Sequence, residues 1–229
     1  MTKFRFKKIN LKNYNWGKLG LELLVVFLGV TGGFVLNNWR EEQQQLRTER
    51  NYLQGFVQDV SDNMSELKKL TEADSLWLEG AIIKAKALRD HELHVDSADV
   101  LMKSIISIYK FEPHTGTYTD ITNSGNLNLI RNLELRTKII DYQQSVEGVE
   151  FVDSHFYQFF NDYITPFVFE EFDVLNGKFL DEEVYGSIKF KNIFAGYLAM
   201  VQQRRMAYID LLDKSVAFKI ELEKRVVQN

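Results

Sequence analysis

The run LGLELLVVFLGVTGGFVL, residues 19–36, decides the fold of this chain, because Glu22 is its only ionisable side chain. As a helix, a run of this length rises roughly 27 Å at about 1.5 Å per residue, close to the hydrocarbon thickness of a bilayer. The run therefore predicts a transmembrane helix. Charges interrupt the apolar parts of the remaining chain every few positions, so we expect a single crossing.

The residues that flank the run predict its orientation. Trp16 and Trp39 lie roughly 35 Å apart on a continuous helix, which suits interfacial aromatic anchors. Six of the 28 Lys and Arg residues precede Glu22, whereas none of the 32 Asp and Glu residues does. Because positive charge is retained in the cytoplasm, the sequence predicts a basic cytoplasmic segment over residues 1–18, a transmembrane helix over 19–36 and an exterior domain over 37–229.

In a Gram-negative bacterium this topology corresponds to a single-pass inner-membrane protein with a periplasmic C-terminal domain. The N-terminal cations, interleaved with apolar residues, suit contact with the anionic headgroups of the lipid bilayer. A cleaved secretory signal is the alternative, because it also begins with basic residues and an apolar run. The long run, the lack of an A-x-A site after it and the helical periodicity from Asn37 to Leu70 favour a retained anchor.

The composition of the exterior part predicts an all-α domain. Two prolines and 13 glycines leave few chain breaks, and an aromatic content of 13% supplies bulk for one core. The chain has no cysteine, so packing rather than disulfides must stabilise it. We expect the transmembrane helix to continue into a bundle of long antiparallel helices.

A seven-residue apolar repeat predicts the first exterior helix. Leu46, Leu53, Val60 and Leu67 form the repeat, and Phe56 and Leu70 add a second row. We expect this helix to end near Leu70 and to pack on an antiparallel helix from about Glu72 to Arg89. The covering face would consist of Leu76, Trp77, Ile83, Ala87 and Leu88. A coiled coil between copies of the chain is the alternative.

Capping and breaking residues predict the remaining elements. We expect Ser97 to cap a helix that runs to about Lys110, and Thr117 with Asp120 to open a short helix that Gly125 ends. Asn132 would cap a long helix that Pro166 ends. Residues 173–188 are predicted to form a loop with a short strand, and a final helix is predicted from Phe190 to Val226.

Two sets of residues resemble an uncharacterised family of single-pass, N-terminally anchored envelope proteins of Gram-negative bacteria. The first set is Glu22, Gly29, Asn37, Asn38 and Trp39, followed by Glu49, Tyr52, Leu53, Phe56 and Asp59. The second set is Tyr118, Ile121, Ser124, Gly125, Leu127, Leu129, Ile130, Asn132, Leu135, Arg136, Ile139 and Tyr142. The resemblance implies a membrane-anchored helical exterior domain, with no assigned activity. Leu21 departs from the pattern, because the family tends to have glycine there.

Glu22, Gly29 and Gly33 are the candidate contacts within the membrane. Glu22 lies near the inner interface, where it can pair with Lys18 four residues earlier. Alternatively, this carboxylate contacts a polar group of another membrane subunit or takes part in a proton relay. Gly29 and Gly33 form a G-x-x-x-G spacing that lets two helices approach closely. These residues point to other envelope membrane proteins, or to a second copy of the chain, as partners.

Basic residues of the exterior domain are the candidates for a partner surface. Arg131 and Arg136 flank the predicted corner after Gly125, and Arg204 with Arg205 lies in the last helix. Such pairs bind acidic partners or simply face solvent. Because the basic cluster is confined to the first 18 residues and the exterior domain is acidic, nucleic acid is not an expected partner.

The sequence contains no recognisable catalytic or cofactor motif. There is no G-x-S-x-G and no glycine-rich phosphate loop after a strand. His91 and His94 are three residues apart, but no further His or Cys cluster joins them, so we expect a solvated loop rather than a zinc site. We therefore predict no enzyme activity, no cofactor and no metal.

Two function classes remain after these exclusions. The first is a noncatalytic interaction or scaffold subunit of a cell-envelope complex. The second is a periplasmic ligand-sensing domain that signals through a separate partner, because the predicted cytoplasmic segment is too short for an output domain. A buried pocket with convergent polar groups would favour sensing. A filled core with an exposed apolar patch would favour scaffolding.

Overall fold

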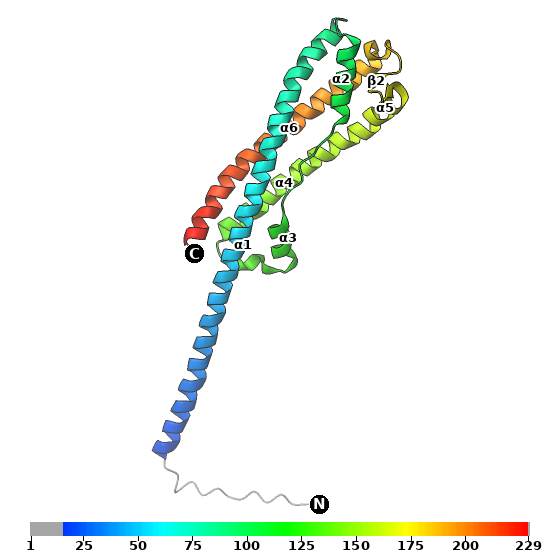
Figure 1. Cartoon of the computed structure of the whole chain (residues 1–229). Coiled ribbons are helices and arrows are strands. Elements are labelled where there is room, and N and C mark those ends of the chain that lie inside the picture. Colours follow the sequence, from blue (N-terminus) through cyan, green and yellow to red (C-terminus); the bar gives the residue numbers. More distant parts are fainter. Residues whose placement is uncertain (1–15, 229) are drawn as a thin grey trace, which may run out of the picture. The chain divides into compact units, whose positions relative to one another are not determined.

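The computed structural model describes residues 16–228, and the chain divides into two compact units, Met1–Thr48 and Glu49–Asn229. Predictions for residues 1–15 lie outside the described part. Helices make up nearly all of the described chain, and one two-stranded hairpin is the exception among these residues (Figure 1). The predicted all-α class is confirmed.

Helix α1 (Trp16–Arg89) is 74 residues long and corrects the predicted helical hairpin. We expected a turn between Leu70 and Glu72, but the helix passes through these residues. The reason is visible in the burial pattern, which keeps spacings of three and four residues beyond that point, through Leu67, Thr71 and Asp74. The same face of the helix therefore stays covered and no reversal is required.

Two short helices follow α1. α2 (Val95–Ile106) is capped by His94, whose Nδ1 accepts the backbone N–H of Asp96, so the prediction of Ser97 as the cap was wrong by one turn. α3 (Gly116–Asn123) precedes a 3-10 turn, η2 (Asn126–Leu129). Gly125 joins them with φ 71°, a left-handed conformation that glycine adopts without strain, as predicted.

The long helix after this corner runs further than predicted. Asn132 caps α4 (Leu133–Phe159), because its Oδ1 accepts the backbone N–H of Leu135 at 2.8 Å. Pro166 does not end the helical stretch. A π-helical turn, η3 (Phe160–Ile164), leads into α5 (Thr165–Glu171), and Pro166 lies in the first turn of α5, where a missing N–H is tolerated.

A small hairpin connects α5 to the last helix. β1 (Phe172–Asp173) pairs antiparallel with β2 (Lys178–Phe179), with Phe172 opposite Phe179. The 3-10 turn η4 (Val184–Gly186) precedes α6 (Ile188–Gln228). The predicted loop with a strand over 173–188 and the predicted final helix are confirmed, with the ends shifted by a few residues.

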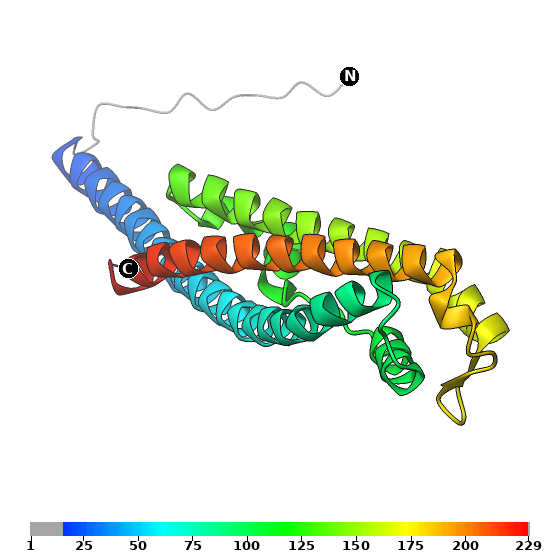
Figure 2. The ribbon, with the colours of Figure 1, turned by 90° about the horizontal axis from the view of Figure 1, so that it is seen from above.

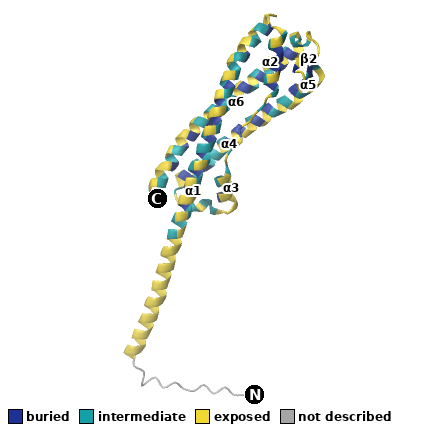
Figure 3. Ribbon diagram, viewed as in Figure 1, coloured by how far each residue is buried: buried dark blue, intermediate teal, exposed yellow. Residues whose placement is uncertain are grey.

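The unit Glu49–Asn229 is a bundle in which α4 and α6 lie side by side (Figure 2). Its buried residues lie along α1, α4 and α6 (Figure 3) and form three clusters. One cluster joins α2, α5 and the hairpin to α6. A second contains Leu67, Tyr208 and Leu211, and a third contains Leu53, Ile139 and Phe218. Leu53, Val60 and Leu67 of the seven-residue repeat thus pack within one chain, and Leu46 is half-buried.

Candidate functional site

The apolar stretch of α1 contains the membrane-contact candidates. Every residue from Trp16 to Glu42 is exposed, including Trp39 and the run 19–36. This helix is long and apolar enough to cross a membrane, and none of its most apolar window is buried by the rest of the chain. No described residue covers this apolar surface, and the helix is therefore a candidate membrane span.

The predicted small-residue face of this stretch is open. A Cβ added at Gly29 or Gly33 would meet nothing within 4 Å. Glu22 is also exposed in the single chain. Contacts of these three residues with lipid or with another helix stay predictions, and the open glycines allow bulky substitutions without an intramolecular clash.

Arg204 corrects the predicted partner surface, because its side chain is buried. Nη2 of Arg204 donates to Oδ1 of Asp74 at 2.6 Å, and Nη1 donates to the carbonyl of Tyr109 at 3.0 Å. The guanidinium also lies 4.3 Å from the centroid of the Phe156 ring. A charge this deep is tolerated only when it is paired and hydrogen-bonded, so Arg204 belongs to the interior and not to a docking surface.

A second acid extends this buried polar network. Asp153 accepts the Tyr208 hydroxyl at 2.7 Å and the backbone N–H of Phe111 at 3.3 Å. Burial raises the pKa of the Asp153 carboxyl, and the hydrogen bond from Tyr208 opposes that rise. Burial also raises the pKa of the Tyr208 hydroxyl, and the neighbouring Asp153 charge raises it further.

Within the network, Asp74 neutralises the charge of Arg204. Burial alone would lower the pKa of the Arg204 guanidinium, but the charge of Asp74 and their hydrogen bond outweigh it and raise this pKa. The Tyr109 hydroxyl donates to Asp74 at 2.8 Å. Perturbed acids often mark active sites, but these groups are buried against one another. The network therefore fixes how α1, α4 and α6 pack.

The other three predicted arginines differ in exposure. Arg131 is exposed and lies 4.0 Å from the buried Glu49. Arg136 is half-buried and donates from Nε and Nη2 to the carbonyl of Ile130, which holds the turn after η2. Arg205 is half-buried. Arg131 is thus the member of the predicted set that presents an exposed cation, and its binding of a partner stays a prediction.

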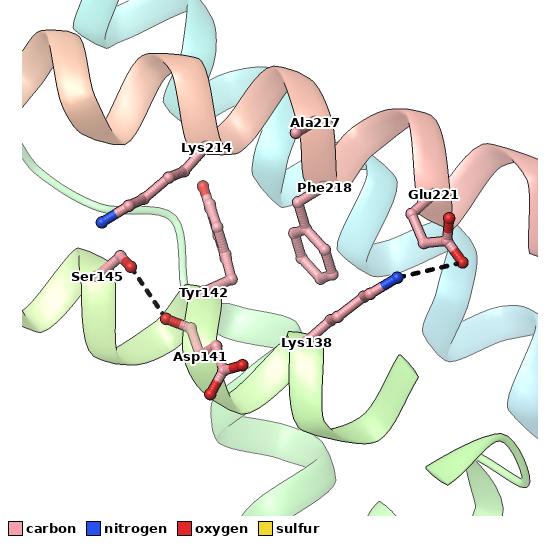
Figure 4. A pocket seen from close by; sticks show the side chains of 8 residues that line it. All are labelled: Lys138, Asp141, Tyr142, Ser145, Lys214, Ala217, Phe218 and Glu221. Carbon is pink, nitrogen blue, oxygen red and sulfur yellow. Dashed lines mark hydrogen bonds and ion pairs between the residues drawn. The ribbon is translucent and has the colours of Figure 1, made fainter. Parts of the chain in front are cut away.

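A groove between α4 and α6 is the candidate ligand site (Figure 4). It has a volume of about 370 Å³, and the rings of Tyr142 and Phe218 stack at its base with centroids 4.8 Å apart. The lysines at its rim are already paired: Lys138 Nζ lies 2.8 Å from Glu134, and Lys214 Nζ lies 2.8 Å from Asp210. The groove therefore offers two aromatic rings for contact, and acidic residues neutralise the lysines at its rim.

An exposed apolar patch near the hairpin was missed from the sequence. Phe169, Val174, Leu175, Leu180 and Ile188, here called the hairpin patch, are all exposed. Leu175 is 97% exposed and Phe169 is 80% exposed. The available signal was the alternation of single apolar residues with acids over 169–188, which we interpreted only as a loop.

The histidines offer no metal site within residues 16–228, where no group of three His, Asp or Glu side chains is placed to hold an ion. His94 serves as a helix cap, and His91 follows α1 with φ 59°. His155 is exposed, and its Nδ1 lies 2.9 Å from the carbonyl oxygen of Phe151.

Compared with known proteins, the chain matches no protein-family model, no curated protein and no solved structure. The resemblance of its membrane and corner motifs to an uncharacterised envelope family therefore stays a prediction.

Proposed function

We propose that this protein is a membrane-anchored, noncatalytic interaction subunit of a cell-envelope complex. The observation that carries the proposal is the complete exposure of residues 16–42, which include the apolar run. Leaving this much apolar surface in water is unfavourable at about 25 cal/mol per Å². A bilayer around residues 19–36 removes that cost and holds the rest of the chain at the membrane.

Charge distribution supports an orientation with residues 1–18 in the cytoplasm and residues 37–229 in the periplasm. Basic residues precede the run and no acidic residue does, which is the pattern of cytoplasmic flanks. We infer that the inner membrane of a Gram-negative bacterium is the location.

A noncatalytic role is supported by what the bundle buries and what it exposes. Three buried ionisable groups already have partners within the chain, because Arg204 pairs with Asp74 and Asp153 accepts the Tyr208 hydroxyl. The hairpin patch, by contrast, exposes apolar side chains. A packed interior with an apolar surface patch is the combination expected of a protein that binds other proteins.

The anchoring half of the proposal is tested by extracting membranes with alkaline carbonate and sequencing the N-terminus of the mature chain. We expect the protein to stay in the membrane pellet with residues 19–36 intact. A mature chain that begins after Gly33 would identify a cleaved signal instead. A C-terminal tag that is digested only when the cytoplasmic side is opened would contradict the orientation.

The interaction half is tested by purifying the full chain in a mild detergent and measuring the mass of the complex. We expect a mass above that of one chain in its micelle. Replacing Gly29 and Gly33 with Ile tests the helix contact, because neither change clashes within the chain. Recovery of a monomer without any partner would contradict the proposed function.

The groove between α4 and α6 supports ligand sensing as a second candidate. Its volume of about 370 Å³ and its stacked Tyr142 and Phe218 suit a small ring-bearing molecule. Its rim lysines are satisfied by acids of their own helices, which leaves few polar groups to orient a ligand. The groove therefore supports this candidate less strongly than the exposed patch supports interaction.

A further inference from the structure

The hairpin patch is carried by consecutive elements at one end of the bundle. Phe169 lies on α5, Val174 and Leu175 lie in the turn between β1 and β2, Leu180 follows β2, and Ile188 begins α6. The labels of α5 and β2 lie together at one end of the bundle in Figure 1, and Figure 3 shows both exposed and buried residues at that end. The elements that carry the five residues therefore lie at one end of the bundle.

The turn that presents Leu175 is internally hydrogen-bonded. Oδ1 of Asp173 accepts the backbone N–H groups of Leu175 and Asn176, both at 3.0 Å, and Oδ2 accepts Nδ2 of Asn176 at 2.6 Å. Gly177 closes the turn with φ 65° and donates its N–H to the Asp173 carbonyl. These bonds lower the pKa of the Asp173 carboxyl and keep it ionised.

The strands below the turn are fixed to the core. Phe172 and Phe179 are buried and pack edge to face with centroids 5.3 Å apart. The backbone N–H of Phe179 donates to Oδ1 of the buried Asp99 on α2 at 3.0 Å. Because the hairpin is anchored on two sides, binding through Leu175 would require little ordering of the loop.

Acidic residues lie close to the patch in the sequence. Residues 169–188 contain six acids and one basic residue, Lys178. Lys189 follows directly, and its Nζ lies 2.9 Å from Glu170 and 3.8 Å from Glu171, so the exposed negative charge is concentrated at Asp181, Glu182 and Glu183. Turn positions usually carry Gly, Pro, Asn, Asp or Ser, so Val174 and Leu175 are not needed to make the turn. The sequence therefore places exposed apolar side chains next to an acidic segment, residues 181–183.

We propose that the hairpin patch docks into an apolar cleft on another protein whose border carries Lys and Arg side chains. Leu175 and Phe169 are the central apolar contacts, and Asp181, Glu182 and Glu183 pair with the basic border. This inference rests on the proposed role as an interaction subunit and names the surface that performs it.

Charge selects this partner over a lipid surface or a second copy of the chain. Anionic headgroups repel an acidic border. A two-fold contact between identical patches would bring Asp181, Glu182 and Glu183 of one chain toward the same acids of the other. A basic border around an apolar cleft satisfies both features of the patch at once.

The test uses the full-length chain in its native membrane with a benzophenone amino acid at position 175. The control has the same probe at Leu133, an exposed leucine at the start of α4 that belongs to none of the three core clusters. We expect one discrete protein adduct from position 175 and none from position 133. The cross-linked peptide of the partner should contain Lys or Arg.

Two variants give the test a second readout. Leu175→Asp and the double change Glu182→Lys with Glu183→Lys should each reduce the adduct formed from a probe at position 169 at least tenfold, and the matched Leu133→Asp should leave it unchanged. All three changes are at exposed positions, and unchanged melting by circular dichroism confirms folding. Raising the salt concentration should also reduce the adduct, because an ionic border is screened.

The outcomes separate this inference from the proposed function. An adduct of twice the chain mass, an adduct to lipid only, or equal adducts from positions 175 and 133 would each overturn docking by the hairpin patch. A complex in mild detergent that survives Leu175→Asp would overturn the inference and leave the proposed function standing. A full chain that is monomeric in mild detergent would count against the proposed function itself.

Discussion

Two stretches of helix α1 have the same backbone and opposite surroundings. Residues 19–36 are exposed throughout, and Glu22 is their one charge. Residues 49–74 bury a side chain every three or four positions, among them Leu53, Leu67 and Asp74. The backbone conformation is equal in both, so the pattern of side chains alone decides whether a helix needs a protein core or another apolar medium.

The largest expected change in unfolding free energy comes from replacing one acid in each of the two stretches of α1. Asp74→Asn leaves the buried Arg204 guanidinium without its counter-charge, so we expect a loss of about 3–5 kcal/mol in the free energy of unfolding. Glu22→Gln should leave the unfolding of the bundle unchanged, because Glu22 is exposed. Denaturant titration of both variants in detergent measures the difference.

A double variant tests whether the uncompensated charge of Arg204 causes this loss of stability. Asp74→Leu with Arg204→Met removes both charges, and apolar replacement of a buried ion pair is often neutral or stabilising. We expect the double variant to recover most of the stability that Asp74→Asn loses. Equal losses in the single and double variants would show that packing volume, rather than the uncompensated charge, controls stability at this place.

The next largest change in unfolding free energy is expected when one leucine in each stretch is replaced. Leu53 is fully buried in the cluster with Ile139 and Phe218, so Leu53→Ala should cost about 2–5 kcal/mol of unfolding free energy. Leu28→Ala should leave that free energy unchanged, because Leu28 contacts no core cluster of the described chain. A comparable loss in Leu28→Ala would mean that the apolar run contributes to the bundle.

Two glycines within the buried part of α1 should respond with opposite signs. A Cβ at Gly55 would lie 2.7 Å from Oγ1 of Thr117, so we expect Gly55→Ala to destabilise the bundle by about 1 kcal/mol through overpacking. A Cβ at Gly80 would meet only the flexible end of Lys84 at 3.7 Å. Gly80→Ala should therefore stabilise by about 0.5–1 kcal/mol. Thermal melting of both variants distinguishes these outcomes.

The smallest effect concerns a buried acid without a direct guanidinium pair. Because burial raises the pKa of Asp153, its protonated form is favoured in the folded chain, and its contribution is largest below the unfolded pKa and is lost as pH rises through the folded pKa. The unfolding free energy of the native chain minus that of Asp153→Asn should therefore increase as pH falls from about 7 to about 4. A difference that decreases would contradict the raised pKa.

Local patterns were sufficient to predict much of the fold. The apolar run, the repeat at Leu53, Val60 and Leu67, the cap at Asn132 and the left-handed Gly125 each depend on neighbours in sequence, and the structure contains all of them. The errors arose where a local signal was weak or overridden. Nothing breaks a helix between Leu70 and Glu72, and the π-helical turn before Pro166 accommodates the proline within a continuing helical stretch.

The site residues were harder to predict, because their roles depend on distant partners. Arg204 and Arg205 are adjacent in sequence, and only the fold shows that the first pairs with Asp74 inside the bundle. The hairpin patch is apolar in a segment whose many acids suggested an ordinary solvated loop. To predict both features, one must know which face of each element is covered. Periodicity does not give this information for short segments or for segments with polar residues on both faces.

The ion pair between Asp74 and Arg204 joins residues 130 positions apart, and Tyr109 contacts both of them. Contacts of such long sequence separation form only after the intervening chain has been ordered, which slows folding. A growing chain that has not yet delivered α6 therefore holds an uncompensated carboxylate along α1. Completion of the last helix is the event that neutralises this carboxylate, so any nascent or truncated form lacking Arg204 is expected to remain open to proteases.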